Sequence, residues 1–144
     1  MHALARASLL AALVSLPALA AEDPLPASVF AADFGRYGPG GDCSKGPRVE
    51  VAASGLVITV DGQAERLAKF DIAWTYSGPD YQGASHWLFP YGGGDTHPVL
   101  MTLSADETPG KMRVEAYDHG WKGGPPLSKR HQALVDGSPY RRCD

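Results

Sequence analysis

Short apolar stretches separated by turn residues run through most of the chain, and this pattern predicts strands. Residues 48–51 alternate charged side chains with Val, which places both Val side chains on one face. Residues 56–60 form a second stretch that is apolar and β-branched. The dipeptide Asp61-Gly62 that follows is typical of a type I′ hairpin turn. Residues 63–70 are therefore expected to return antiparallel to residues 56–60.

A central hairpin is expected next. Residues 71–76 and 84–91 are rich in aromatic and β-branched side chains, and a cluster of turn residues separates them. Two later strands are expected around a turn at residues 106–110. The positions expected to face inward in these last strands are Val99, Met101, Leu103, Met112, Val114 and Ala116.

Helical patterns are confined to two short segments. Residues 27–33 are expected to form one or two turns that dock through Phe30, with Phe34 close behind. Near the other end, Ser128 is a suitable N-cap for a helix through Val135. Both segments are too short to organise a core, so they are expected to lie at the periphery of the strands.

The two cysteines, Cys43 and Cys143, predict one structural disulfide. An even pair in an exported chain is typically bridged, and the loop that this bridge closes spans about 100 residues. The Gly-rich residues 35–43 are expected to form the loop that carries Cys43 to its partner. A reactive thiol pair or a metal site would require nearby ligands, which the sequence does not show. The expected fold is all-β, an antiparallel β-sandwich or barrel with one or two short peripheral helices, closed by one disulfide.

The first 20 residues have the features of a secretory signal peptide. His2 and Arg6 precede an apolar core, and residues 18–20 read Ala-Leu-Ala, a suitable cleavage site. No Cys lies at this cleavage site, so a lipid anchor is not expected. Residues 21–144 are then expected to form a single exported β domain, periplasmic or secreted.

The charge of the mature chain is mildly negative. The whole chain has 13 basic and 16 acidic residues, and cleavage removes Arg6, so 12 − 16 gives a net charge of −4. Basic residues cluster only at Lys129-Arg130 and Arg141-Arg142. Nucleic acid and an anionic membrane are therefore poor candidates for a partner.

The turn cluster of the central hairpin contains a recognisable motif. Ser77-Gly78-Pro79-Asp80-Tyr81 combines a Pro that fixes φ with a Gly that permits positive φ. Its Ser77-Gly78-x-x-Tyr81 spacing resembles the signature of the bacterial periplasmic lysozyme inhibitors. Without this resemblance, the same residues predict an ordinary hairpin turn in which Tyr81 packs back on the sheet.

The resemblance implies that a rigid loop enters the cleft of a lysozyme. In that family the Ser and Tyr hydroxyls hydrogen-bond the catalytic carboxylates, which here assigns these roles to Ser77 and Tyr81. Hydroxyl groups suit the task because they both donate and accept hydrogen bonds. The residues expected to contact a partner are Ser77, Gly78, Asp80, Tyr81, Trp87 and Tyr91.

Catalysis is not indicated by the remaining polar residues. The four His of the mature chain, expected on the surface or in turns, lack the spacings typical of zinc sites, and no nucleophile-elbow motif is present. We therefore expect a binding protein with no cofactor and no metal. An alternative to lysozyme inhibition is a sugar- or protein-binding module that uses an exposed aromatic platform. The candidate aromatic residues are Trp74, Tyr76, Tyr81, Trp87, Tyr91 and Trp121.

Overall fold

The computed structural model describes residues 23–75, 85–92 and 94–143. The expected signal peptide and the Ser77–Tyr81 motif lie outside these residues. Nine strands form one sheet in the order β4-β3-β2-β1-β9-β8-β7-β6-β5, and all neighbours are antiparallel. The strands are β1 (Gly35–Pro39), β2 (Arg48–Ala52), β3 (Gly55–Val60), β4 (Gln63–Leu67), β5 (Asp71–Thr75), β6 (Ser85–Phe89), β7 (Val99–Leu103), β8 (Lys111–Ala116) and β9 (Tyr140–Arg142).

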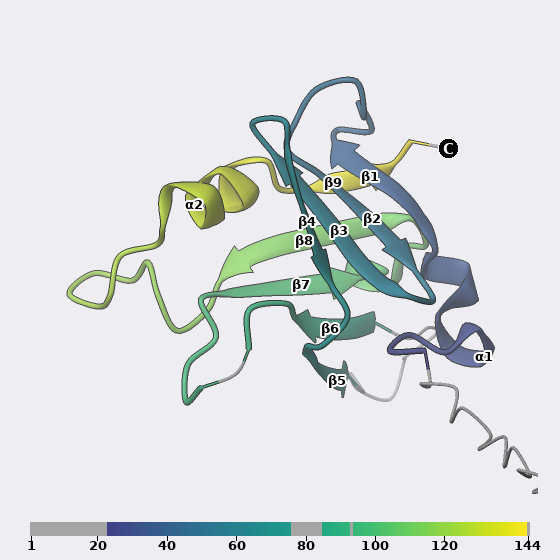
Figure 1. The fold of residues 1–144 in the computed structure, drawn as a ribbon, viewed down its shortest axis with the longest axis horizontal. Helices are drawn as coiled ribbons and strands as arrows, with labels where there is room; N and C mark the ends of the chain where they lie inside the picture. The colour runs from purple at the N-terminus through teal and green to yellow at the C-terminus, as the bar shows by residue number, and fades with distance from the viewer. Residues whose placement is uncertain (1–22, 76–84, 93, 144) are drawn as a thin grey trace, which may run out of the picture.

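The sheet consists of two meanders joined in the middle. Strands β1–β4 form one meander and β5–β8 the other, while β9 pairs with both β1 and β8. Figure 1 shows that the sheet curls on itself, so that β1–β4 cross in front of β7 and β8. The predicted all-β, antiparallel fold is confirmed, and it takes the form of one curled, half-barrel sheet.

The helices are short, as predicted. Helix α1 (Ala27–Phe30) continues into the 3₁₀ turn η1 (Ala31–Asp33), and a second 3₁₀ turn, η2 (Ala105–Glu107), follows β7. Helix α2 (Lys129–Asp136) lies against β3 and β8, at the opposite end of the curl from α1 (Figure 1). The Ser128 hydroxyl accepts a hydrogen bond from the backbone N–H of His131, which confirms the predicted N-cap.

The core fills the concave side of the sheet. Alternate residues of β7 and β8 contribute to it, as the pattern predicted, and Phe30 docks there from α1. Phe34 is partly buried against the same core. The largest fully buried side chains are Tyr37, Tyr140, Phe30, Leu25, Leu56, Ile58, Leu88, Met101, Leu103, Met112, Leu134 and Val49.

The first hairpin turn was also predicted correctly. Asp61 and Gly62 have φ values of 51° and 76°, as a type I′ turn requires at both central positions. Strands β3 and β4 pair on either side of them, from Val60 opposite Gln63 to Leu56 opposite Leu67.

Two expectations about local structure were wrong, and one strand was not predicted. The Gly-rich segment expected as a loop forms β1 over Gly35–Pro39, because β2 and β9 supply hydrogen-bonding partners on both sides. The tail residues Tyr140–Arg142, for which no strand was predicted, form β9 because β1 and β8 supply partners on both sides. Ala116, expected to face inward, is exposed because it ends β8 beyond the covered part of the sheet.

The predicted disulfide joins Cys43 and Cys143, with Cα atoms 6.0 Å apart. It lies beside the β1–β9 pair, where the backbone N–H of Cys143 also donates to the carbonyl oxygen of Arg36 at 2.9 Å. The bond therefore fastens the seam between the two meanders. A disulfide of this kind fits a protein of an oxidising compartment. Among the described residues, no helix is long and apolar enough to cross a membrane.

Candidate functional site

The outer face of the second meander carries a row of side chains that do not enter the core. Trp87 of β6 lies opposite Thr102 of β7, which lies opposite Arg113 of β8. The neighbouring residues Leu88, Met101 and Val114 form the adjacent row and face the core. Because side chains alternate along a strand, Trp87, Thr102 and Arg113 share the outer face.

A groove with a volume of about 430 Å³ runs along β7 on this face. Leu100 and Thr102, both from the central strand, form its floor and are nearly buried. The half-buried Trp87 lies on one side of the groove. Arg113 and the exposed Glu115 lie on the other side. The complete lining is Ser85, Trp87, Leu100, Thr102, Asp106, Glu107, Arg113 and Glu115. The groove thus combines one large aromatic ring with both signs of charge.

One end of the groove is closed by a turn with an unusual backbone. Ser104, Asp106 and Glu107 have φ values of 49°, 54° and 56°, in the left-handed region that non-glycine residues seldom adopt. Such conformations cost about 1–3 kcal/mol each and persist only where the surrounding contacts enforce them. Three of them within four positions indicate a turn whose shape is maintained by strong local contacts.

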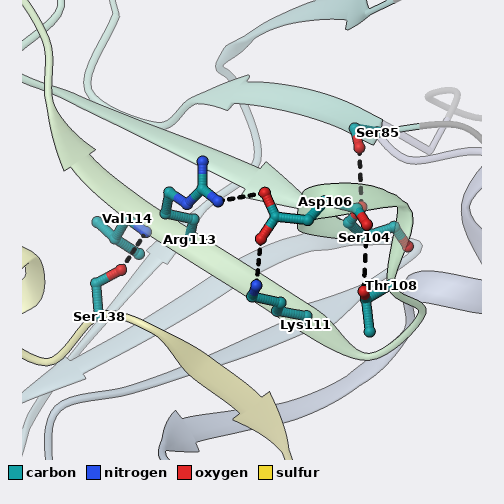
Figure 2. A network of polar contacts seen from close by, with 8 residues as sticks. All are labelled: Ser85, Ser104, Asp106, Thr108, Lys111, Arg113, Val114 and Ser138. Carbon is teal, nitrogen blue, oxygen red and sulfur yellow. Dashed lines mark hydrogen bonds and ion pairs between the residues drawn. The ribbon is translucent and has the colours of Figure 1, made fainter. Parts of the chain in front are cut away.

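Those contacts centre on Asp106. Its carboxylate accepts hydrogen bonds from Lys111 and Arg113, two residues of β8 (Figure 2). The hydroxyl of Thr108 donates to the carbonyl oxygen of Asp106 at 3.2 Å. The hydrogen bond from Lys111, followed by that from Arg113, lowers the pKa of the Asp106 carboxyl. The ion pairs therefore hold Arg113 in place at the side of the groove.

A buried polar network lies beneath the same turn. The Ser85 hydroxyl donates to the carbonyl oxygen of Ser104 at 2.8 Å, as Figure 2 shows. The Ser104 hydroxyl donates in turn to Oδ1 of Asp33 at 2.7 Å. Oδ2 of Asp33 lies 2.8 Å from Nδ1 of His86, and the Asp33 and His86 side chains are 2% and 5% exposed. Because an ionised carboxylate only accepts, the His86 Nδ1 carries the hydrogen.

This network joins α1 and η1 to the start of β6. His86 also packs against Phe30, with ring centroids 4.6 Å apart. The carbonyl oxygen of Asp33 accepts from the Tyr37 hydroxyl at 2.8 Å. Sequence reasoning had placed all the histidines on the surface or in turns and was wrong for His86. Asp33 and His86 lie 53 positions apart, so no local pattern relates them.

The structure does not bring the predicted site residues together. Ser77, Gly78, Asp80 and Tyr81 lie outside the described residues, between the last pair of β5 and β6, Thr75 opposite Ser85. Trp87 lines the groove. Tyr91 does not join it, because its ring stacks on His131 of α2 with centroids 4.2 Å apart. Trp121 is 59% exposed in the loop before α2, outside the groove.

Tyr91 and His131 belong to a separate cluster with Glu65 and Arg130. The Tyr91 hydroxyl donates to Oε2 of Glu65 at 3.4 Å, and Nε of Arg130 lies 3.2 Å from the same oxygen. Burial raises the pKa of the Tyr91 hydroxyl and lowers the pKa of the His131 imidazole. Nearby Glu65 opposes the shift of His131, whereas Arg130 and His119 add to it. The cluster links β4, α2 and the segment after β6.

We expect this cluster to make stability depend on pH. Because the pKa of His131 in the folded protein lies below its ordinary value of 6.5, the unfolded chain binds the proton first as the pH falls. The contribution of His131 to the free energy of unfolding is therefore fully present above pH 6.5, and it is lost as the pH falls through the lower, folded-state pKa. Replacing His131 by Gln should remove this share of the acid destabilisation. Urea unfolding at a series of pH values measures it, and equal pH profiles for both proteins would contradict the assignment.

The described residues contain no group of three or more His, Cys, Asp or Glu side chains that could hold a metal ion. The groove offers stacking on Trp87 and hydrogen bonds to charged groups, which is the chemistry of binding. No protein-family model, no curated protein and no solved structure matches the chain.

Proposed function

We propose that the protein is an exported binding protein that inhibits a lysozyme by inserting the Ser77–Tyr81 segment into its active-site cleft. The observation that supports this most is the position of the motif. Strands β5 and β6 are paired antiparallel up to Thr75 and Ser85, and Ser77 and Tyr81 lie between these two strands in the sequence. An inhibitory loop of the family that this motif resembles occupies the same kind of position.

The strand that follows this segment, β6, is anchored at its first residues, which favours a loop that acts as an inserted element. Ser85 and His86, the first residues of β6, are anchored through Ser104 and Asp33. A loop with a fixed base loses less conformational entropy on docking than one on a mobile base. The net charge of −4 in the mature chain also complements a basic partner enzyme.

Removal of the two hydroxyls tests the proposal. The mature protein should reduce cell-wall lysis by at least one class of lysozyme, and Ser77→Ala and Tyr81→Phe should each weaken inhibition. Each lost hydrogen bond to a charged carboxylate should cost about 1.5–3 kcal/mol, or roughly one to two powers of ten in the inhibition constant. Unfolding free energies should change by less than about 0.5 kcal/mol, because neither change removes buried apolar volume.

Matched controls are available on the described surface. Ser54 is exposed in the β2–β3 turn and Tyr117 is 47% exposed at the end of β8, so Ser54→Ala and Tyr117→Phe remove the same atoms elsewhere. Both variants should inhibit as the parent protein does. If no lysozyme class is inhibited at micromolar protein, the proposal is wrong and the motif is an ordinary turn.

A further inference from the structure

We propose that the groove along β7 is a binding site for a neutral oligosaccharide. The site consists of described residues only, and it does not depend on whether the Ser77–Tyr81 segment inhibits a lysozyme. Its three components are the indole of Trp87, the opposing charged side chains Arg113 and Glu115, and the floor formed by Leu100 and Thr102.

The shape of the groove suits a chain of sugar rings. Trp87 and Arg113 are on β6 and β8, so two strand spacings, about 10 Å, separate their backbones across β7. One ring can lie between the two side chains, above the buried floor. The volume of about 430 Å³ lies within the range of small-molecule sites, about 300–1,000 Å³. Because the site is a groove on an outer sheet face, further sugar units can extend along the surface.

The charges of the groove distinguish this ligand from its rivals. Three carboxylates line the groove, those of Asp106, Glu107 and Glu115, against one cation, Arg113. An anionic ligand would therefore be repelled, and a cationic ligand would be disfavoured on the side of the Arg113 guanidinium. Sugar hydroxyls both donate and accept hydrogen bonds, so they can accept from the guanidinium of Arg113 and donate to the carboxylate of Glu115. The apolar face of a pyranose ring can meanwhile stack on the indole of Trp87. A neutral, hydroxyl-rich ligand satisfies all three groups.

The polar side of the groove is set in position before any ligand binds. The Asp106 carboxylate pairs with Arg113 and Lys111, and the left-handed residues Ser104, Asp106 and Glu107 define the turn that carries it. Ordering these side chains on binding would otherwise cost about 0.5–1.5 kcal/mol for each. Local backbone strain of this kind is concentrated at ligand-binding sites.

Nuclear magnetic resonance and calorimetry on the purified mature protein test the site. Chitotetraose and maltotetraose serve as neutral probes, and trilysine and a tetra-galacturonate serve as charged ones. The indole N–H signal of Trp87 is identified by its loss in Trp87→Phe. At least one neutral probe should shift this signal and leave that of Trp121 unchanged. The proposal is wrong if only a charged probe shifts this signal, or if none of the four probes shifts it.

Variants locate the binding energy. Glu115 is exposed, so Glu115→Gln should fold normally and weaken saccharide binding about tenfold, because it replaces a charged acceptor by a neutral one.

Trp87→Ala should abolish saccharide binding, and the dispersion of its spectrum shows whether the fold is retained. Trp121→Ala is the matched control, because it removes an exposed indole outside the groove and should bind normally. Unchanged affinity in Glu115→Gln, or equal losses in Trp87→Ala and Trp121→Ala, would refute the site. Ser77→Ala and Tyr81→Phe should not alter saccharide binding.

Discussion

Replacing Asp33 by Ala should lower the free energy of unfolding by about 1–3 kcal/mol for each of the two buried hydrogen-bonding partners that it leaves unsatisfied. The Asp33 side chain is 2% exposed, and its two carboxylate oxygens accept from His86 and Ser104. The substitution leaves both donors buried and without this acceptor. A loss of this size is a large fraction of the stability of a small domain, about 5–15 kcal/mol.

A double-mutant cycle separates this pair from a general loss of packing. The variants are Asp33→Ala, His86→Ala and the two together, measured by urea unfolding. If the two side chains interact as described, the double variant should lose about 0.5–3 kcal/mol less than the sum of the single variants. Asp95→Ala, at an exposed position, is the control and should stay within about 0.5 kcal/mol of the parent. Strictly additive losses would show that the Asp33–His86 contact contributes nothing of its own.

Removal of the disulfide should have a comparable effect. The double variant Cys43→Ala/Cys143→Ala releases a closure of 100 positions, for which the chain-entropy model gives a loss of about 4.7 kcal/mol as an upper figure. Most of the effect arises in the unfolded chain, which becomes free to separate its ends. The folded sheet should persist, because β1 and β9 remain paired over three positions.

Two measurements check this result. Free-thiol titration of the unfolded, unreduced parent protein should find essentially no thiol, since the described residues contain no free cysteine. Urea unfolding should then give the same stability for the reduced parent as for the double variant. Equal stability of the oxidised parent and the double variant would contradict the entropic account.

The sequence predicted those parts of the fold that depend on neighbouring residues. The hairpin at Asp61-Gly62 and the cap at Ser128 both follow from local backbone chemistry, and both were found. Strands β1 and β9 were missed because Gly35–Pro39 and Tyr140–Arg142 have weak strand preferences of their own. They become strands because each provides the other with a hydrogen-bonding partner, and this partner is about 100 positions away in the chain.

The candidate groove was only partly foreseen, for a related reason. Trp87 was chosen for its aromatic side chain, but its neighbours Thr102 and Arg113 are set by the register across three strands. The sequence gives no direct measure of that register. Asp106 was expected only as part of the turn at residues 106–110, and its ion pairs with Arg113 and Lys111 form only when the turn folds back on β8.

The seam between the two meanders also determines how the molecule would respond to a protease. Only residues 68–70 connect β4 to β5 along the chain, and Lys69 within them is exposed. A cut there would separate β1–β4 from β5–β9 in sequence. The β1–β9 hydrogen bonds and the Cys43–Cys143 bond would still join the two pieces. A nicked protein would therefore remain one covalent, two-chain molecule in an oxidising medium. After reduction of the disulfide, the two fragments would associate only noncovalently, and the fraction in the complex would depend on protein concentration.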